Sequence, residues 1–506
     1  MKHLQNLHVL VLGLGESGLA MARWCAAHGS VVSVWDTRSP APQAAALLEH
    51  VSNAVVLGGP LTEASLEGIQ LVLKSPGLSP HDPRIAEPLT AAAVPVQGEL
   101  DLFVRALADL KEDRGYAPKV LAITGTNGKT TTTAMAALLI ARCGKRVAVA
   151  GNIGPTMLQT LADAIAADEL PDVWILELSS FQLDNVKGFE PDAAVVLNLS
   201  EDHLDWHGNM AAYVAAKARV FGESAVMVIN RDDAAVERLV PAPLPGKGRF
   251  AKAVSRNVVR FGTTAPLLPG DFGLKAENGI AWLVRALESD QSIKRSRKDL
   301  EAEELHIQRL MPADALRVRG RHNAANALAA LALATAIDCP LAPMLHGLRD
   351  YAGEAHRVQF VATVGGVDAF DDSKGTNVGA TVAALNGLGD DRAPGRLVVI
   401  LGGDGKGQDF APLAAPIRQH GRAVATIGRD AALIEDALEN CGVTVQRFDT
   451  LQAATRWAHS LAHAGDALLL SPACASLDMF RNYAHRAQVF VNEVHALAAE
   501  RGGVIA

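Results

Sequence analysis

The chain has few cysteines and no long apolar run, and both shortages narrow its class. No C-x-x-C pair and no spacing typical of zinc ligands occurs among its five cysteines. Such a scattered, odd-numbered set suits a reducing compartment, so we expect free thiols in a cytoplasmic protein. No apolar run approaches the roughly 18 residues of a membrane span, and the apolar segment His8–Gly15 is too short for a signal peptide. The cysteines are Cys25, Cys143, Cys339, Cys441 and Cys474.

Positive charge is also scarce relative to negative charge. Lys and Arg together number 47 against 55 Asp and Glu, which gives a formal net charge of −8. Because a broad nucleic-acid-binding surface needs an excess of basic residues, this balance argues against a nucleic-acid partner. An anionic substrate must therefore be held by a few local positive groups.

Length and periodicity predict a three-domain α/β protein. The chain has 506 residues, more than a single domain usually holds, and its 49% hydrophobic content gives ample material for cores. Short apolar segments alternate with helical patterns along most of the chain, as in parallel α/β layers. The polar stretch Lys111–Pro118 indicates a linker between the first and second domains. Another series of strands begins near Ala355 and indicates the third domain. The expected domains are residues 1–114, 115–354 and 355–506.

Two segments stand apart from this alternation. Residues Ala265–Pro312 show little periodicity, and the charged run Ser289–Glu304 within them is expected to be a solvated surface excursion. The Ala-rich segment Ala324–Ile337 is expected to be a buried helix.

The expected strands are Leu7–Leu12, Val31–Trp35, Val120–Ile123, Val147–Ala150, Val173–Leu178, Ala193–Leu199, Ala225–Ile229, Val367–Phe370, Arg396–Leu401, Ala423–Ile427 and Ala467–Ser471.

The clearest chemical signal is a phosphate-binding loop between a strand and an Ala-rich helix expected to start near Thr132. Glycines let backbone N–H groups approach phosphate oxygens, and the helix N-terminus adds its positive dipole end. The loop departs from G-x-x-x-x-G-K-[ST], because Ile123 stands six residues before Lys129, but an ordinary turn would not carry G-K-T-T after a strand. The predicted nucleotide-binding residues here are Gly125, Thr126, Asn127, Gly128, Lys129, Thr130 and Thr131.

A second phosphate-type turn lies near the N-terminus. The segment Gly13–Gly18 fits G-x-G-x-x-G after a strand, and Asp36 closes the next strand. Alone, this pattern favours a nicotinamide-dependent oxidoreductase. The same geometry suits any diphosphate ligand, so it identifies a ligand class and leaves the reaction open.

Further polar segments follow strands in the second block, where open α/β sheets bind ligands. They are Gly151–Gly154, Glu177–Gln182 and Asn198–Asp205. Beside a nucleotide loop, the carboxylate of Glu177 and the imidazole of His203 are candidate Mg²⁺ ligands.

Downstream, three loops follow strands of the third block, at Phe370–Asn377, Gly402–Lys406 and Ser471–Asp478. Their convergence predicts a cleft in which Lys374 holds a carboxylate. Before them, Asn323 and Asn326 share a helix face, which indicates polar recognition unless Asn323 is a helix cap. Lys217 on its own is most simply a surface lysine.

Taken together, these segments resemble the Mur ligases of peptidoglycan synthesis across essentially the whole chain. The shared motifs are T-G-T-N-G-K-T-T, G-N-I-G, L-E-L-S-S-F-Q-L, N-x-S-E-D-H-L-D, Y-x-x-A-K, H-N-x-x-N-A and H-R, in that order. The motifs D-D-S-K-G-T-N, L-G-G-D-G-K and S-P-A-C-A-S-L-D resemble the branch that adds D-glutamate to UDP-N-acetylmuramoyl-L-alanine.

The resemblance implies a Rossmann-like N-terminal UDP-binding domain, a central P-loop ATPase-type parallel-sheet domain and a mobile Rossmann-like C-terminal domain. It assigns the Gly13–Gly18 turn to uridine diphosphate rather than to a nicotinamide. It also implies a cytoplasmic ligase with no membrane span, for which we expect a monomer. The implied UDP-substrate contacts are Glu16, Ser17, Asp36, Thr37, Ser75, Gly77, Asn152 and His203.

The implied reaction is phosphorylation of the L-alanyl carboxylate by ATP, followed by attack of the D-glutamate amine on the acyl phosphate. The implied catalytic residues are Lys129, Glu177, His203 and Lys217. Two Mg²⁺ ions are implied, one held by Thr130 and Glu177, the other by His203 and Lys217. Lys217 would carry a CO₂-derived carbamate, because a bare ammonium would repel the ion.

The resemblance also implies that the third domain completes the ATP site and binds the incoming amino acid. The implied ATP contacts beyond the loop are Asn326, Arg357 and Asp372. The implied D-glutamate contacts are Lys374, Thr376, Ser476, Leu477 and Tyr483, with Lys406 reaching or supporting that pocket.

Three other classes account for parts of the sequence. An oxidoreductase leaves the loop at Thr124–Thr131 unused, and a regulatory NTPase leaves the third domain's pocket unexplained. A folylpolyglutamate-type ligase shares the central architecture but gives no reason for an intact UDP-type first domain.

Overall fold

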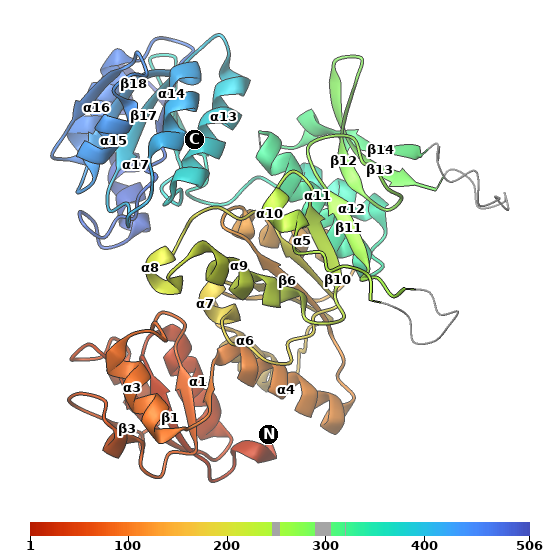
Figure 1. Cartoon of the computed structure of the whole chain (residues 1–506). Helices are drawn as coiled ribbons and strands as arrows, with labels where there is room; N and C mark the ends of the chain where they lie inside the picture. Colours follow the sequence, from red (N-terminus) through yellow and green to blue (C-terminus); the bar gives the residue numbers. More distant parts are fainter. Residues whose placement is uncertain (245–252, 289–304, 319, 506) are drawn as a thin grey trace.

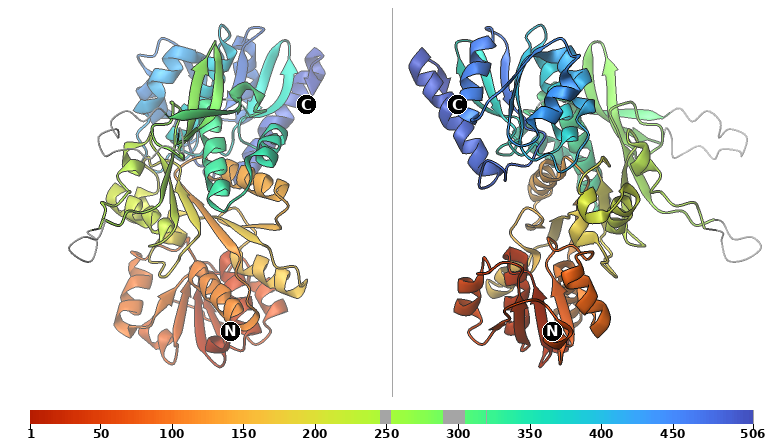
Figure 2. Two further views of the ribbon diagram at one scale, coloured as in Figure 1. Left: turned by 90° about the vertical axis from the view of Figure 1, so that its right-hand side faces the viewer. Right: turned by 60° about the vertical axis from the view of Figure 1, so that its left-hand side comes forward.

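The computed structural model describes residues 1–244, 253–288, 305–318 and 320–505. The described residues form four β-sheets (Figure 1). Residues 1–114 lie at one end of the molecule and residues 355–505 at the other, with the central part of the chain between them (Figure 2). Within the described residues, no helix is long and apolar enough to cross a membrane.

The N-terminal sheet is parallel, with strand order β3-β2-β1-β4-β5. Its central strand is continuously apolar and buried from Val9 to Leu12, as expected when helices cover both faces. The strands are β1 (His8–Leu12), β2 (Val31–Trp35), β3 (Val55–Val56), β4 (Leu71–Lys74) and β5 (Val96–Gln97); the helices are α1 (Glu16–Ala27), α2 (Ala44–His50), α3 (Pro83–Ala92) and α4 (Glu99–Arg114).

The central sheet is also parallel, with strand order β11-β10-β9-β6-β8-β7. A small antiparallel sheet, β12-β13-β14, lies beside it. The strands are β6 (Lys119–Thr124), β7 (Val147–Gly151), β8 (Val173–Glu177), β9 (Ala193–Val196), β10 (Val226–Asn230), β11 (Val258–Phe261), β12 (Phe272–Glu277), β13 (Ile280–Leu287) and β14 (His306–Pro312). The helices are α5 (Lys129–Arg142), α6 (Met157–Ala166), α7 (Ser180–Leu183), α8 (Leu204–His207), α9 (Met210–Ala218), α10 (Ala234–Glu237), α11 (Arg321–Ala336) and α12 (Leu341–Asp350).

The C-terminal sheet is mixed, with strand order β19-β18-β17-β20-β16-β15-β21. β15 runs antiparallel to both of its neighbours, and the other pairs are parallel. The strands are β15 (Gln359–Val364), β16 (Val367–Asp371), β17 (Leu397–Gly402), β18 (Gly421–Ile427), β19 (Thr444–Arg447), β20 (Ala467–Leu470) and β21 (Val504–Ile505); the helices are α13 (Val378–Arg392), α14 (Ala414–His420), α15 (Ala431–Leu438), α16 (Leu451–Leu461) and α17 (Tyr483–Arg501).

The two outer domains are attached to the central one differently. A single apolar cluster runs from Trp24 and Phe103 in the N-terminal part to Leu158 and Trp174 in the central part. The buried apolar residues of the C-terminal sheet instead form clusters of their own. Apolar packing therefore holds the N-terminal domain against the central one. The contacts of the C-terminal domain with the phosphate-type loop are polar and are given below.

Most expected strands are confirmed, with ends shifted by a residue or a few, and several expectations are wrong. Helix α4 continues to Arg114, so only residues 115–118 form the connection. Helix α5 begins at Lys129 rather than near Thr132. Strands β12 to β14 lie in the region Ala265–Pro312, whose little periodicity is confirmed by their irregular burial patterns and by a bulge in the pairing of β13 with β14. The charged run Ser289–Glu304 lies outside the described residues.

The expected Ala-rich helix is present as α11, and its burial is confirmed. Residues Ala327 to Ala334 are all at most 1% exposed. Alanine side chains are small enough to let α11 pack against α5 and against the strands of the central sheet. Close packing of this helix supports the strand ends that carry the site.

We expect Ala330→Leu in α11 to lower the free energy of unfolding by ~1–3 kcal/mol, because three extra heavy atoms enter a filled core. Ala342→Leu is the matched control, since Ala342 lies in α12 of the same domain and is exposed. Denaturant unfolding of both variants measures the difference. Equal midpoints for the two variants would contradict the packing described here.

Candidate functional site

The phosphate-type loop between β6 and α5 has a backbone that only glycine can complete. Gly125 and Gly128 have φ of +151° and +80°. A Cβ on Gly125 would lie 2.9 Å from Leu197 Cβ, and one on Gly128 would lie 2.6 Å from Asn326 Oδ1. The loop is therefore pressed between the end of β9 and the start of α11, with the N-terminus of α5 directly behind it.

Two lysines converge on this loop. Lys129 Nζ donates to the carbonyl oxygens of Gly125 and Thr126, both at 2.9 Å. Lys217 Nζ donates to the same Gly125 oxygen at 2.9 Å and to Thr124 Oγ1 at 3.3 Å. At 2% exposure, Lys217 is a buried residue, so its interpretation as a surface lysine is wrong.

Burial changes the protonation of both amines. The pKa of Lys217 is lowered well below its usual value, first by burial and then by the nearby charge of Lys129. The pKa of Lys129 is also lowered by burial, against the opposing effects of Glu177 and Asp202. The two carboxylates of the central domain thus lie close enough to act on the loop lysine.

The two carboxylate oxygens of Glu177 differ in their partners. Its Oε1 accepts a hydrogen bond from Asn152 Nδ2 at 2.9 Å, whereas its buried Oε2 has no hydrogen-bond partner among the described residues. Glycine at position 151 lets its backbone lie close to that of Glu177, because a Cβ there would lie 2.3 Å from the Glu177 carbonyl oxygen. A buried free carboxylate oxygen beside a nucleotide loop fits a cation ligand.

His203 lies at the N-cap position of α8 with φ of +55°. Its ring contacts Phe181 edge-on, with centroids 4.6 Å apart, and its Nε2 lies 3.6 Å from Asp202 Oδ2. Burial lowers the pKa of His203, which favours the neutral imidazole that can bind a metal or accept a hydrogen bond.

Within the described ranges, no group of three or more His, Cys, Asp or Glu side chains could hold a metal ion by itself. The residues present nevertheless fit a magnesium–nucleotide complex, because waters and substrate phosphates supply ligands beside one or two carboxylates in such sites. Thr130 Oγ1 and Glu177 Oε2 are oxygen ligands of the kind that Mg²⁺ prefers.

The C-terminal domain touches the loop through two side chains. Arg357 Nη2 donates to Thr130 Oγ1 at 2.8 Å, and Asn377 Nδ2 donates to Asn127 Oδ1 at 3.0 Å. The charges of Arg357 and Lys374 both depress the pKa of Lys129. Positive groups from two domains thus face one loop.

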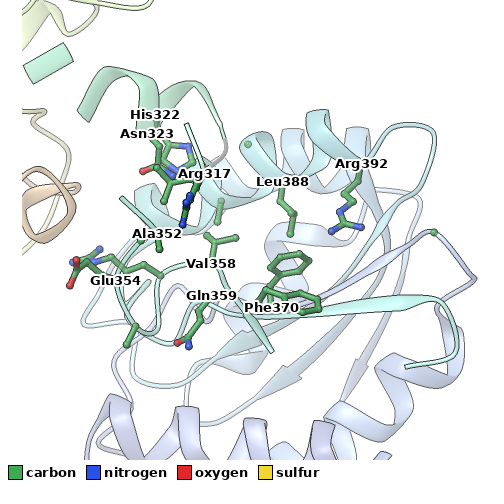
Figure 3. Close-up of a pocket in the computed structure, with 18 residues that line it drawn as sticks. Arg317, His322, Asn323, Ala352, Glu354, Val358, Gln359, Phe370, Leu388 and Arg392 are labelled. Carbon is green, nitrogen blue, oxygen red and sulfur yellow. The ribbon is translucent and has the colours of Figure 1, made fainter. Parts of the chain in front are cut away.

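A cavity of about 940 Å³ lies where the central and C-terminal domains meet. Figure 3 shows His322 and Asn323 at one end of it and Phe370 and Arg392 at the other. Arg357 also lines it, so the cavity extends towards the loop. Asn326 Nδ2 donates to Asn323 Oδ1 at 3.3 Å. The N-cap of α11 is Gly320, so the interpretation of Asn323 as the cap is wrong.

Asp372 faces the interior of its own domain. Its carboxylate accepts hydrogen bonds from Ser471 Oγ at 2.6 Å and from the Val358 N–H at 3.3 Å. Burial raises the pKa of Asp372 to about 7. Its expected contact with ATP stays a prediction.

The residues expected to bind the amino acid lie on two loops of the C-terminal sheet and at the start of α17. Lys374 Nζ donates to the Tyr483 hydroxyl at 3.2 Å and lies 4.6 Å from the centre of that ring. Leu477 is 73% exposed, and Ser476 is buried at 4%. Thr376 is partly buried on the same loop as Lys374.

Arg486 supports this region, and sequence reasoning missed it. This fully buried side chain of α17 donates to the carbonyl oxygens of Ser373 at 2.8 Å and Cys474 at 3.1 Å. Arg486 therefore joins the loop after β16 to the loop after β20. An arginine in the apolar register of a helix was the available signal.

The N-terminal turn forms a separate cavity of about 560 Å³. Ser75 Oγ donates to the Gly13 carbonyl oxygen at 2.6 Å, and Asp36 accepts from the Leu14 N–H at 2.6 Å. Arg38, which sequence reasoning missed, pairs with Asp36 and also lines the cavity. The expected residues that line it are Glu16, Ser17, Thr37, Ser75 and Gly77.

This fold and this site define a three-domain α/β protein with two phosphate-type loops. Family models match along nearly the whole chain: "Mur ligase MurD-like, N-terminal domain" at 7–98, "Mur ligase middle domain" at 123–334 and "Mur ligase, glutamate ligase domain" at 356–474. The chain belongs to the Mur ligase family.

Curated relatives share one name. The "UDP-N-acetylmuramoylalanine--D-glutamate ligase" of Albidiferax ferrireducens is 57% identical over 505 residues, covering 99% of this chain and 98% of that protein. The protein of the same name from Burkholderia mallei is 57% identical over 510 residues, covering 98% of each chain.

Solved structures support the fold. The UDP-N-acetylmuramate-alanine ligase MurC of Thermotoga maritima matches with a TM-score of 0.57 at 19% identity, covering 97% of this chain and 99% of that one. The MurF ligase of the same organism, solved in complex with ADP, matches with a TM-score of 0.57 at 17% identity, covering 99% and 100%.

The Gly128 contact predicts a glycine requirement that a matched variant can isolate. Gly128→Ala should weaken ADP binding ~10-fold or more, because its Cβ would meet the Asn326 amide at 2.6 Å. Gly144→Ala is the control, since Gly144 has a similar φ of +77° and nothing within 4 Å of its added Cβ. Both changes should cost ~1–2 kcal/mol of backbone strain.

Thermal unfolding with and without ADP measures both quantities. The control should retain the full ADP-induced rise in melting temperature, and Gly128→Ala should lose most of it. An equal rise in both variants would refute the tight packing around the loop.

Proposed function

We propose that this chain is the ATP-dependent ligase that joins D-glutamate to UDP-N-acetylmuramoyl-L-alanine in peptidoglycan synthesis. The 57% identity over 99% of the chain to a relative of that name carries the proposal. The products are the UDP-muramoyl dipeptide, ADP and phosphate. We also propose that the protein is a cytoplasmic monomer with domains at residues 1–114, 115–354 and 355–506.

The loop between β6 and α5 is the ATP site of this proposal. Its positive groups neutralise charge as the γ-phosphoryl group passes to the L-alanyl carboxylate. Lys129 acts from within the loop, and Arg357 reaches Thr130 from the C-terminal domain at 2.8 Å. The 940 Å³ cavity beside Asn323 and Arg357 has room for the base and ribose.

Two bound Mg²⁺ ions would supply neutralisation of phosphate charge in this step. Thr130 and Glu177 would hold one ion. His203 and a carbamate on Lys217 would hold the other. Burial lowers the pKa of Lys217, which favours the neutral amine, the form that reacts with CO₂.

The acceptor and the amine enter from opposite sides. The 560 Å³ cavity of the N-terminal domain would hold the uridine diphosphate, with the muramoyl group directed towards Asn152 and His203. Lys374, Thr376, Ser476, Leu477 and Tyr483 would hold D-glutamate with its amine towards the acyl phosphate. Arg486 keeps the two loops of that pocket in place.

We expect phosphate release to require ATP, UDP-N-acetylmuramoyl-L-alanine and D-glutamate together. Replacing D-glutamate with L-glutamate, or the nucleotide substrate with a folate, should leave only background release. A phosphate assay with each component omitted in turn measures this. Addition of L-glutamate to a folate, or hydride transfer with a nicotinamide, would contradict the proposal.

The buried amine gives a second prediction. Lys217→Ala should lower kcat by ~10²-fold or more, because an ion would lose an oxygen ligand. Added acetate or formate should restore part of the activity by occupying the space of the carbamate. Lys145→Ala, at an exposed lysine, is the control and should behave like the unchanged protein in both conditions.

Mass spectrometry under native conditions complements the rescue. An added mass of one CO₂ in the unchanged protein and its loss in Lys217→Ala are the expected results. Full activity in Lys217→Ala without any carboxylate would eliminate the carbamate role.

A further inference from the structure

Asn198, just beyond the end of β9, holds the phosphate-binding loop with both atoms of its side-chain amide. Its Oδ1 accepts from the Asn127 N–H at 2.8 Å, and its Nδ2 donates to the Asn127 carbonyl oxygen at 3.1 Å. Its own carbonyl oxygen also accepts from the Thr126 N–H at 2.9 Å. Both the N–H and the carbonyl oxygen of Asn127 are thus hydrogen-bonded, as backbone groups are in a β-ladder.

The side chain of Asn127 then reaches the C-terminal domain. Its Oδ1 accepts from Asn377 Nδ2 at 3.0 Å. Asn377 is the N-cap of α13, and its Oδ1 accepts from the Ala380 N–H at 2.9 Å. Both ends of the Asn377 amide are therefore used, one within its own domain and one across the interface.

The first turn of α13 lies directly on the loop. A Cβ added at Gly379 would lie 3.1 Å from Asn127 Nδ2 and 3.2 Å from Ser200 Oγ. Glycine at this position leaves room for the approach, so the contact between Asn377 and Asn127 belongs to a packed interface.

We propose that Asn198, Asn127 and Asn377 form a hydrogen-bonded chain that couples nucleotide occupancy of the loop to docking of the C-terminal domain. Asn198 and Asn377 are positioning residues, since they act through Asn127. This coupling presupposes the proposed function only in requiring that the loop binds ATP or ADP.

The energies involved suit a switchable contact. Among the described residues, no apolar cluster is shared by the central and C-terminal domains, and the Asn377–Asn127 and Arg357–Thr130 bonds join them beside the packing of α13 on α11. One neutral hydrogen bond contributes ~0.5–1.5 kcal/mol, which corresponds to a ~2- to 13-fold change in an equilibrium. Nucleotide that fixes the loop backbone would present Asn127 Oδ1 to Asn377 in one geometry, and docking would in turn stabilise bound nucleotide.

Asn377→Ser separates the interface from the helix cap. Serine is about as good an N-cap as asparagine, but its hydroxyl is too short to reach Asn127. The matched control is Asn482→Ser, because Asn482 caps α17 in the same domain through a 2.8 Å bond from the His485 N–H. Asn198→Asp keeps the acceptor for the Asn127 N–H and removes the donor to its carbonyl oxygen.

We expect Asn377→Ser to raise the Kd for ADP ~2- to 10-fold and to reduce the compaction that ADP induces in small-angle scattering. Asn198→Asp should weaken ADP at least as much. Asn482→Ser should change neither quantity. A double-mutant cycle of Asn127→Ala and Asn377→Ser should be non-additive, since both variants remove the same bond.

Three outcomes decide the matter. Normal ADP affinity and compaction in Asn377→Ser, or additive effects in the cycle, would overturn the coupling and leave the proposed function intact. Equal losses in Asn377→Ser and Asn482→Ser would reduce the role of Asn377 to helix capping and overturn the coupling. Failure of the unchanged protein to bind ADP would overturn both the coupling and the proposed function.

Discussion

The carbonyl oxygen of Gly125 accepts hydrogen bonds from both Lys129 and Lys217, and the arrangement of the site depends on this shared acceptor. Burial lowers the pKa of both amines, and the charge of Lys129 lowers the pKa of Lys217 further. The parallel sheet makes this possible, because β6, β8 and β9 end at the same edge and bring their following loops together. Glu177, His203 and Asn198 enter the site from those neighbouring ends.

The two outer domains are attached to the central one by different kinds of contact. A continuous apolar cluster joins the N-terminal domain to α6 and β8, and such an interface resists rotation. The C-terminal domain meets the loop through Arg357 and Asn377, contacts that can form and break at low cost. The C-terminal domain thus meets the loop through polar bonds, whereas the N-terminal domain is joined to the central one by apolar burial.

Local signals in the sequence were enough for the parallel strands, the glycine-rich turns and the Ala-rich helix, because neighbouring residues determine each of them. Long-range contacts were not. Nothing near Lys217 in the sequence reveals its burial against Thr124, and nothing near Arg486 reveals that it ties two loops together. The antiparallel strands β12 to β14 lack clean alternation, so periodicity could not separate them from irregular chain. The family resemblance supplied residue roles that spacing alone left open.

Lys217 is 2% exposed, and this has a chemical consequence of its own. No modifying enzyme can bring an active site to a nitrogen that is enclosed by the loop, α9 and the end of β6. Any group that this nitrogen acquires must be small enough to reach it beside the loop. A neutral amine adds to the electrophilic carbon of dissolved CO₂, and this addition needs no second protein. If Lys217 carries the proposed carbamate, the concentration of dissolved CO₂ would therefore determine how much of the protein is modified.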